Sequence, residues 1–136
     1  MIAALSLAPH PEGGWYRETW RSEAVTANGR AAATSILFLL EAGQRSHWHR
    51  VDADEMWLFQ AGAPLPLSIA AAGGGAERTV TLGPDPLAGH MLQHLVPAGA
   101  WQSAQGPASG WALVACVVAP GFEFAGFELA LPGWRP

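Results

Sequence analysis

The fold and the site are predicted most strongly by the stretch Gly43-Gln-Arg-Ser-His47-Trp-His49-Arg-Val-Asp-Ala-Asp-Glu55. An apolar run to Gly62 follows it. The stretch places two imidazoles and a carboxylate close together in the sequence. Side chains alternate between the two faces of a β-strand, so His47 and His49 are expected on one face, and Glu55 can return to it after a short bend. Three such groups could hold one divalent metal ion with open positions for water or substrate.

Composition narrows the class of protein. A chain of 136 residues fits one domain, residues 1–136, and with half of its residues apolar and only 13% charged it must build a buried core. Seven tryptophans and few charges predict that some burial occurs between subunits, which favours a homodimer. A net charge of -4 with scattered arginines argues against nucleic acid as a partner.

Lysine and cysteine usage exclude some chemistry. All basic residues are arginine, which excludes a Schiff-base amine and the lysine of a P-loop. The only cysteine, Cys116, lies in an apolar run, where we expect a buried, inert thiol. No intrachain disulfide can form, residues 1–8 are too short for a signal peptide, and no run is long enough to span a membrane. We therefore predict a cytoplasmic protein with no membrane partner.

Short strands dominate the predicted secondary structure. Residues 1–8 have short helical character, which ends at the prolines that follow. Runs enriched in β-branched and aromatic residues then predict strands at residues 15–21, 33–40, 55–60, 66–71, 78–82, 91–96, 111–119 and 122–129. Such a series predicts a sandwich or a small barrel, most simply a jelly roll.

Two of these runs, at residues 35–40 and 111–118, are apolar on both alternating sets of side chains. This pattern is typical of strands that are covered on both sides. The barrel interior can cover one side. A second subunit, or the N-terminal segment of this chain, would have to cover the other.

Several motifs resemble those of the cupin superfamily. The segment with His47, His49 and Glu55 resembles its first motif, and Pro97-Ala-Gly-Ala-Trp-Gln102 resembles the second, which normally reads Pro-x-Gly-x-x-His. Residues 10–19, 46–51, 54–57 and 118–124 resemble the signatures of a branch of small single-domain cupins without an agreed activity. The resemblance implies an all-β double-stranded β-helix, the cupin jelly-roll barrel, with a short N-terminal helix, a usual dimer and a pocket inside the barrel.

Two departures from the cupin pattern bear on the metal. Five residues separate His49 from Glu55, where metal-binding cupins usually have three or four, and Gln102 replaces the histidine of the second motif. The implied three-His-one-Glu site is thereby reduced to His47, His49 and Glu55, with Gln102 as an orienting neighbour. The alternative is a solvated strand edge in which Glu55 forms a salt bridge with an arginine.

Aromatic residues are expected around the pocket. By alternation, Trp57 and Phe59 share a face with Glu55, and Trp101 adjoins Gln102. These rings would suit stacking on a sugar ring or another flat small molecule. Core packing explains the same pattern.

The run His10-Pro-Glu-Gly-Gly-Trp-Tyr16-Arg-Glu18 carries paired glycines, which permit a sharp entry into the first strand. Tyr16 and Glu18 then share a face and could close the pocket. Cupin-type sugar-nucleotide epimerases use a histidine base with a tyrosine acid, so by analogy Tyr16 is a candidate acid. The alternative is core packing, with Glu18 in a surface ion pair.

Two functions of different classes follow. The first is an enzyme that isomerises or epimerises a small polar molecule such as a carbohydrate derivative, with His49 or His47 as general base and Glu55 as its orienter or as a metal ligand. The second is a non-catalytic metabolite-binding module, which the incomplete ligand set favours. An Fe(II) dioxygenase ranks third, since two histidines and a carboxylate match its facial triad.

Overall fold

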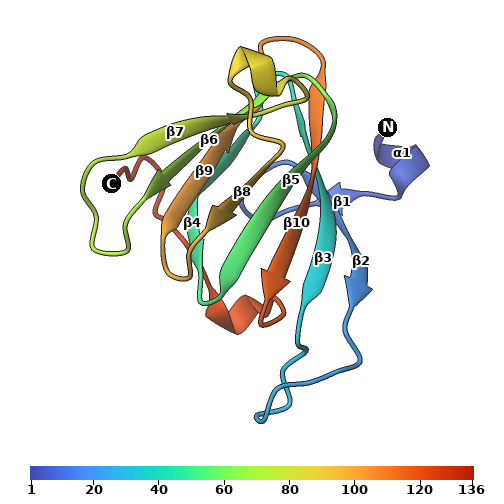
Figure 1. Cartoon of the computed structure of the whole chain (residues 1–136), viewed down its shortest axis with the longest axis vertical. Coiled ribbons are helices and arrows are strands. Elements are labelled where there is room, and N and C mark those ends of the chain that lie inside the picture. Colours follow the sequence, from blue (N-terminus) through green and yellow to red (C-terminus); the bar gives the residue numbers. More distant parts are fainter.

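Short β-strands make up about half of the computed structural model, which describes all residues from Met1 to Pro136 (Figure 1). No helix is both long enough and apolar enough to cross a bilayer. The elements are α1 (Ile2–Leu5), β1 (Ala8–Pro9), β2 (Trp15–Arg21), β3 (Thr34–Glu41), β4 (Arg45–Val51), β5 (Asp54–Gly62), β6 (Leu65–Ala70), β7 (Arg78–Leu82), β8 (Gln93–Val96), β9 (Trp101–Gln105), β10 (Trp111–Ala119) and β11 (Phe127–Leu129), with short 3-10 turns at Pro86–Ala88 and Phe124–Gly126.

Two antiparallel sheets face each other and enclose the core. The first has the strand order β1-β2-β3-β10-β5-β8, and the second has the order β11-β4-β9-β6-β7. Strands β1, β2 and β3 follow one another in the sequence, but several other neighbours come from distant parts of it, as Figure 1 shows for β3, β10 and β5. This arrangement confirms the predicted all-β jelly roll with a short N-terminal helix.

The main core fills the space between the sheets and follows the alternation of the strands. Phe38 of β3, Trp57 of β5, Leu67 of β6 and Val114 of β10 are each at most 1% exposed and belong to one apolar cluster. The aromatic pair Phe38 and Trp57 packs edge to face, with ring centroids 6.0 Å apart.

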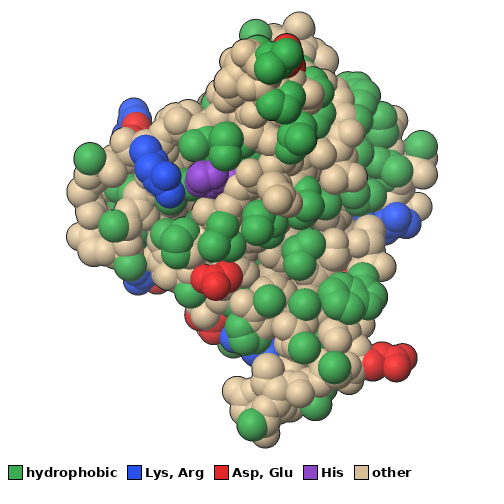
Figure 2. All heavy atoms as spheres, in the orientation of Figure 1, with side chains coloured by type: hydrophobic (Ala, Val, Ile, Leu, Met, Phe, Trp, Pro, Cys, Tyr) green, Lys and Arg blue, Asp and Glu red, His purple; other side chains and the backbone are tan.

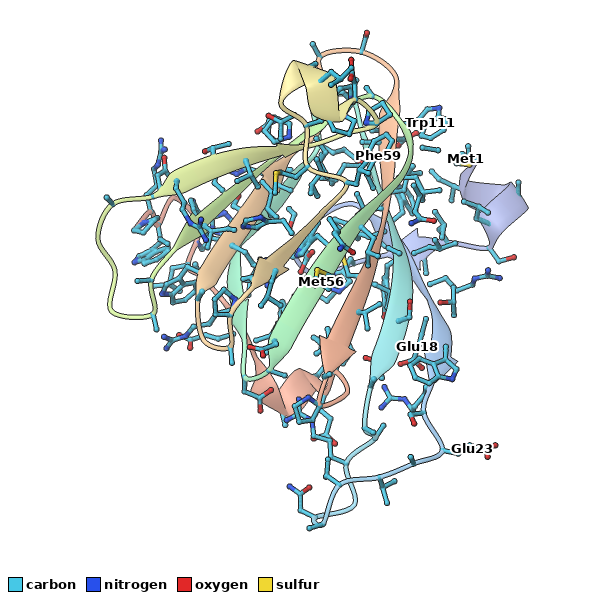
Figure 3. All side chains as sticks on the ribbon, viewed as in Figure 1. Met1, Glu18, Glu23, Met56, Phe59 and Trp111 are labelled. Carbon is cyan, nitrogen blue, oxygen red and sulfur yellow. The ribbon has the colours of Figure 1, made fainter.

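The outer face of the first sheet is covered only in part by this chain. Leu7, which follows α1, packs on Leu39 and Leu113, so the N-terminal segment covers one end of β3 and β10. Farther along, Met56 and Leu95 lie opposite each other on the outer side of β5 and β8. Figure 2 shows apolar side chains spread over this side of the molecule, and Figure 3 places Met56 on it.

The structure differs from the predicted strands in two places. The sequence predicts one strand at residues 122–129, but these residues form a 3-10 turn at Phe124–Gly126 and only then the short strand Phe127–Leu129. Strand β9, at Trp101–Gln105, is not among the predicted runs, because its sequence has no β-branched residue. Burial between β4 and β6 outweighs its weak intrinsic preference.

Candidate functional site

A glycine turn carries the residues before β2 into the mouth of the barrel. Gly13 has a φ of +104°, which side-chain-bearing residues rarely adopt, and a Cβ there would strike the backbone carbonyl of Arg45. The backbone N–H of His47 donates to the carbonyl of Glu12 at 2.7 Å, which ties the turn to β4. The side chains of His10 and Glu12 are consequently buried at the end of the barrel, at 5% and 8% exposure.

A β-bulge in β4 separates the two histidines of the first motif. The pairing of β4 with β9 shifts register between Ser46 and His49, where β4 contains one extra residue. Ser46 and His49 both become buried, while the His47 Nε2 atom lies 3.0 Å from the carbonyl oxygen of Leu131 in the C-terminal segment. The expectation that His47 and His49 project from the same face is therefore wrong, because the bulge breaks the strict alternation.

His49 and Glu12 form the central contact of the site. The His49 Nε2 atom lies 3.1 Å from Glu12 Oε2, and its Nδ1 atom lies 2.8 Å from the carbonyl oxygen of His47. The Nδ1–H therefore donates to that carbonyl, which leaves Nε2 free to share a proton with Glu12. Ser46 Oγ donates to the other oxygen, Glu12 Oε1, at 3.0 Å.

Burial sets the protonation of this pair. It raises the pKa of Glu12 to about 8, against the opposing hydrogen bond from Ser46, and it lowers the pKa of His49. At neutral pH the proton then belongs to Glu12, which donates it to the His49 ring. The contact therefore joins a neutral acid to a neutral imidazole.

Glu55 is the second buried carboxyl, at 6% exposure, and no arginine reaches it. Gln102 Nε2 donates to Glu55 Oε2 at 2.7 Å, and Trp57 Nε1 donates to Gln102 Oε1 at 2.7 Å. The thiol of Cys116 lines the same cavity as Glu55. Burial raises the pKa of Glu55 to about 7 and raises the pKa of Cys116 well above its usual value.

These groups surround one small cavity. Its volume is about 30 Å³, which is room for about two water molecules. A larger ligand would require the side chains at the mouth to move. The lining residues are His10, Glu12, Tyr16, Thr34, Ile36, His49, Val51, Glu55, Cys116, Val118, Phe122 and Phe127.

Tyr16 and Glu18 share a strand but occupy different surroundings. Tyr16 lines the cavity, and its ring packs edge-on to His10 with centroids 4.5 Å apart. Glu18 lies outside, in an open hollow that also touches Tyr16, and pairs with Arg21 at 2.6 Å. Figure 3 shows Glu18 on the outer part of β2. Glu18 therefore matches the alternative expectation, a surface ion pair with an arginine.

The predicted aromatic walls lie elsewhere in the fold. Trp57 is buried in the main core and reaches the site only through Gln102. Phe59 also packs against that core, toward the far end of β5 (Figure 3). Trp101 packs on the opposite face of β9, against Trp134 with ring centroids 4.4 Å apart. None of these three rings lines the cavity.

The donor set does not fit the metal ion that the cupin resemblance implies. No group of three or more His, Cys, Asp or Glu side chains is arranged to hold an ion. His47 faces the C-terminal segment, and Gln102 presents its amide nitrogen to Glu55 because Trp57 holds its oxygen. An amide N–H₂ has no lone pair for a metal, so Gln102 does not supply the fourth ligand of the implied site.

Sequence reasoning identifies His49, Glu55 and Tyr16 as site residues but misses His10 and Glu12. Both belong to a loop, and only the pairing of that loop with β4 brings them to the cavity. The signal that could have found them is the double glycine directly after Glu12, which marks a close backbone approach.

The jelly roll, with a titratable site between its sheets, defines the class as a cupin. The family model described as cupin superfamily (DUF985) matches residues 1–130, and the chain belongs to that family. No curated protein matches the chain.

Solved structures of two relatives superpose closely. A protein from Shewanella oneidensis has 43% identity and a TM-score of 0.89, over 95% of this chain and 81% of that one. A hypothetical protein from Leishmania major has 36% identity and a TM-score of 0.87, over 95% of this chain and 84% of that one. Oxalate decarboxylase from Bacillus subtilis, at 19% identity and a TM-score of 0.65 over 90% of this chain and 29% of its own, shares the fold.

Proposed function

We propose that this protein is an isomerase or epimerase that moves a proton on a small polar molecule, such as a carbohydrate derivative, inside the barrel. The observation that carries the proposal is the 3.1 Å contact between Glu12 and His49 in a small cavity that Glu55 also lines. Proton transfer needs a group that donates and a group that accepts at the same site. The chain's own side chains supply both.

The two carboxyls divide these roles through their different surroundings. Glu12 has a pKa of about 8 and keeps its proton at neutral pH, so the Glu12–His49 pair acts as the acid. Glu55 has a pKa of about 7, close to the working pH, where a general base is most effective. Pairs of carboxyls whose surroundings separate their pKa values recur in acid–base enzymes. Tyr16, at the cavity wall, is a second candidate acid.

Deuterium exchange tests this function. The protein is incubated in D₂O with a panel of unphosphorylated aldoses and ketoses, and loss of the exchanging C–H signal is followed by proton NMR. We expect exchange on at least one sugar, reduced about 100-fold or more in Glu12→Gln and in Glu55→Gln. Glu77→Gln is the matched control, because Glu77 pairs with Arg135 on the surface. Full exchange in both site variants would contradict the proposal.

A non-catalytic binding module is the second candidate. It is favoured by the hydrogen bond from Gln102 to Glu55, which holds that carboxyl in place as a binding site would. Thermal stabilisation by a sugar that the protein does not exchange or convert would select this function. The Fe(II) dioxygenase has no support in the donor set.

We also propose that a second copy of this chain covers the outer face of the first sheet. That face is continuous across the strand register: Val117 of β10 lies opposite Met56 of β5, and Met56 lies opposite Leu95 of β8. Leu95 is 43% exposed within one chain. An apolar sheet face of this kind is typical of homodimer interfaces.

A further inference from the structure

We infer that His10 is a catalytic residue that donates a hydrogen bond from Nε2 to the carbonyl oxygen of the substrate, and that the substrate is an uncharged carbonyl compound. The inference rests on the proposed function, because it names the substrate class and the group that would stabilise charge on the substrate oxygen during proton transfer.

The hydrogen bonds of His10 define which nitrogen carries its proton. The backbone N–H of Glu12 donates to His10 Nδ1 at 3.2 Å, so Nδ1 is an acceptor and the proton lies on Nε2. Nε2 makes no hydrogen bond within the protein, although the side chain is only 5% exposed and lines the cavity. The unpaired Nε2 atom is not fully buried, so it is open to the cavity, where an oxygen of a bound ligand would accept its N–H.

Packing keeps the imidazole neutral. The rings of Tyr16 and Phe38 lie edge-on to His10, with centroids at 4.5 and 5.9 Å, and the titratable groups that face it are Glu12 and His49. Burial lowers the pKa of His10 to about 4, and the nearby His49 acts in the same direction. A neutral imidazole working with a carboxylate base is an arrangement suited to enolising a carbonyl compound.

The charges of the cavity restrict the substrate. No arginine or lysine lines it, whereas Glu12 and Glu55 both do. A carboxylate or phosphate would therefore meet two carboxyls with no cation to balance it. The arginine in the adjoining hollow, Arg21, is already paired with Glu18. The part of the substrate that enters the cavity should carry no charge.

The step balances with these groups alone. Glu55 takes a proton from the carbon next to the carbonyl, the C–H electrons form a carbon–carbon double bond, and the carbonyl π electrons move onto the oxygen that His10 binds. In an epimerisation, the Glu12–His49 pair then delivers a proton to the opposite face of the same carbon, and the oxyanion electrons form the carbonyl again. In an isomerisation, the pair delivers the proton to the former carbonyl carbon, while the hydroxyl proton on the adjacent carbon passes to the oxyanion and the new carbonyl forms at that adjacent carbon. In both cases Glu55 keeps the proton it took and Glu12 is left ionised, and proton exchange with water restores the two groups. No oxidant, reductant or co-reactant is needed.

Two substitutions separate the donor role of His10 from its structural role. His10→Asn can keep an acceptor for the Glu12 N–H but cannot extend a donor to the cavity. His10→Gln has a longer side chain whose amide N–H₂ can reach the position of Nε2, so it should restore part of the function. Glu77→Gln again serves as the distant control.

The ligand used in the test is glycolohydroxamate, a small mimic of an enediolate, with binding measured by calorimetry. We expect wild type and the control to bind it, His10→Asn to bind it about tenfold or more weakly, and His10→Gln to recover part of the affinity. The anion glycolate should bind less well than the uncharged hydroxyacetone. In ¹⁵N-histidine spectra of the free protein, His10 should remain a neutral Nε2–H imidazole from about pH 5 to pH 8.

Equal hydroxamate binding by wild type and His10→Asn would overturn the inference. Absence of binding by wild type, tighter binding of glycolate, or an Nδ1–H tautomer would do the same. The outcome is distinguishable from failure of the proposed function: His10-dependent binding without deuterium exchange would refute the isomerase alone. Exchange that is undiminished in His10→Asn would refute the role of His10 alone.

Discussion

Glu12→Gln should remove much of the pH dependence of stability above neutrality. The amide that this change introduces would occupy the place of the protonated carboxyl, with its oxygen accepting from Ser46 and its N–H₂ donating to His49 Nε2. The substitution therefore imitates the neutral form of Glu12. The variant should fold normally and differ from wild type only where wild-type Glu12 would have to ionise.

The sign and size of the effect follow from the raised pKa. A carboxyl whose pKa rises from 4.5 unfolded to about 8 folded stabilises the protein at low pH, and this contribution is lost as the pH rises from 4.5 through 8. Each pH unit corresponds to about 1.4 kcal/mol. Glu12 alone should therefore lower the free energy of unfolding by about 2 kcal/mol between pH 6.5 and pH 8. Glu55 adds to the loss up to about pH 7. The lowered pKa values of His10 and His49 act mainly below pH 6.5, where they oppose stability as pH falls.

Urea unfolding at about pH 6.5 and pH 8 measures this difference, with the midpoint and the slope recorded for wild type, Glu12→Gln and Glu77→Gln. Wild type and the surface control should both lose stability at the higher pH, and Glu12→Gln should lose about 2 kcal/mol less. If Glu12→Gln lost as much stability as wild type, Glu12 would not be protonated in the folded protein, and the proposed acid would not exist.

Other changes have definite expected outcomes. Gly13→Ala should destabilise the protein by about 3 kcal/mol or more, seen as a lower thermal midpoint, because the new Cβ meets the Arg45 carbonyl; an unchanged midpoint would show that the turn does not cross β4. Gln102→Leu should cost about 2 kcal/mol in urea unfolding by leaving Glu55 without its amide donor, and a neutral effect would contradict the described contact. Met56→Asp should convert a dimer into a monomer in analytical ultracentrifugation, whereas an unchanged mass would place the interface elsewhere. Prolonged treatment with a metal chelator should leave the thermal midpoint unchanged, and a large drop would reveal a metal site that the donor set does not suggest.

The fold could be predicted because two independent signals agree on it. Runs at residues 15–21, 78–82 and 111–119 combine β-branched or aromatic residues with turn residues at their ends, and they coincide with β2, β7 and β10. The motif resemblance supplied the way in which these strands connect. Strand β9 could not be predicted from its composition. It forms a strand because it pairs with a neighbouring strand on each side.

Only those site residues could be predicted whose position depends on the regular alternation of a single strand. Glu55 lies at the start of an apolar strand, so its burial could be predicted from alternation. The β-bulge in β4 has no recognisable sequence signal, and it places His47 on a different face from His49. Alternation also cannot distinguish the cavity from other buried surroundings. Trp101 is buried, as its pattern suggested, but against Trp134 of the C-terminal segment.

The central claim is that two buried carboxyls titrate near neutral pH, so that Glu12 holds a proton beside His49 while Glu55 can accept one. Carbon-13 NMR of the protein labelled at glutamate side-chain carboxyls tests it most directly, with Glu12→Gln and Glu55→Gln used to assign the signals. Two carboxyls should titrate near pH 7 to 8, and one of these two signals should be missing from each variant. Titration of every glutamate below about pH 5 would contradict it.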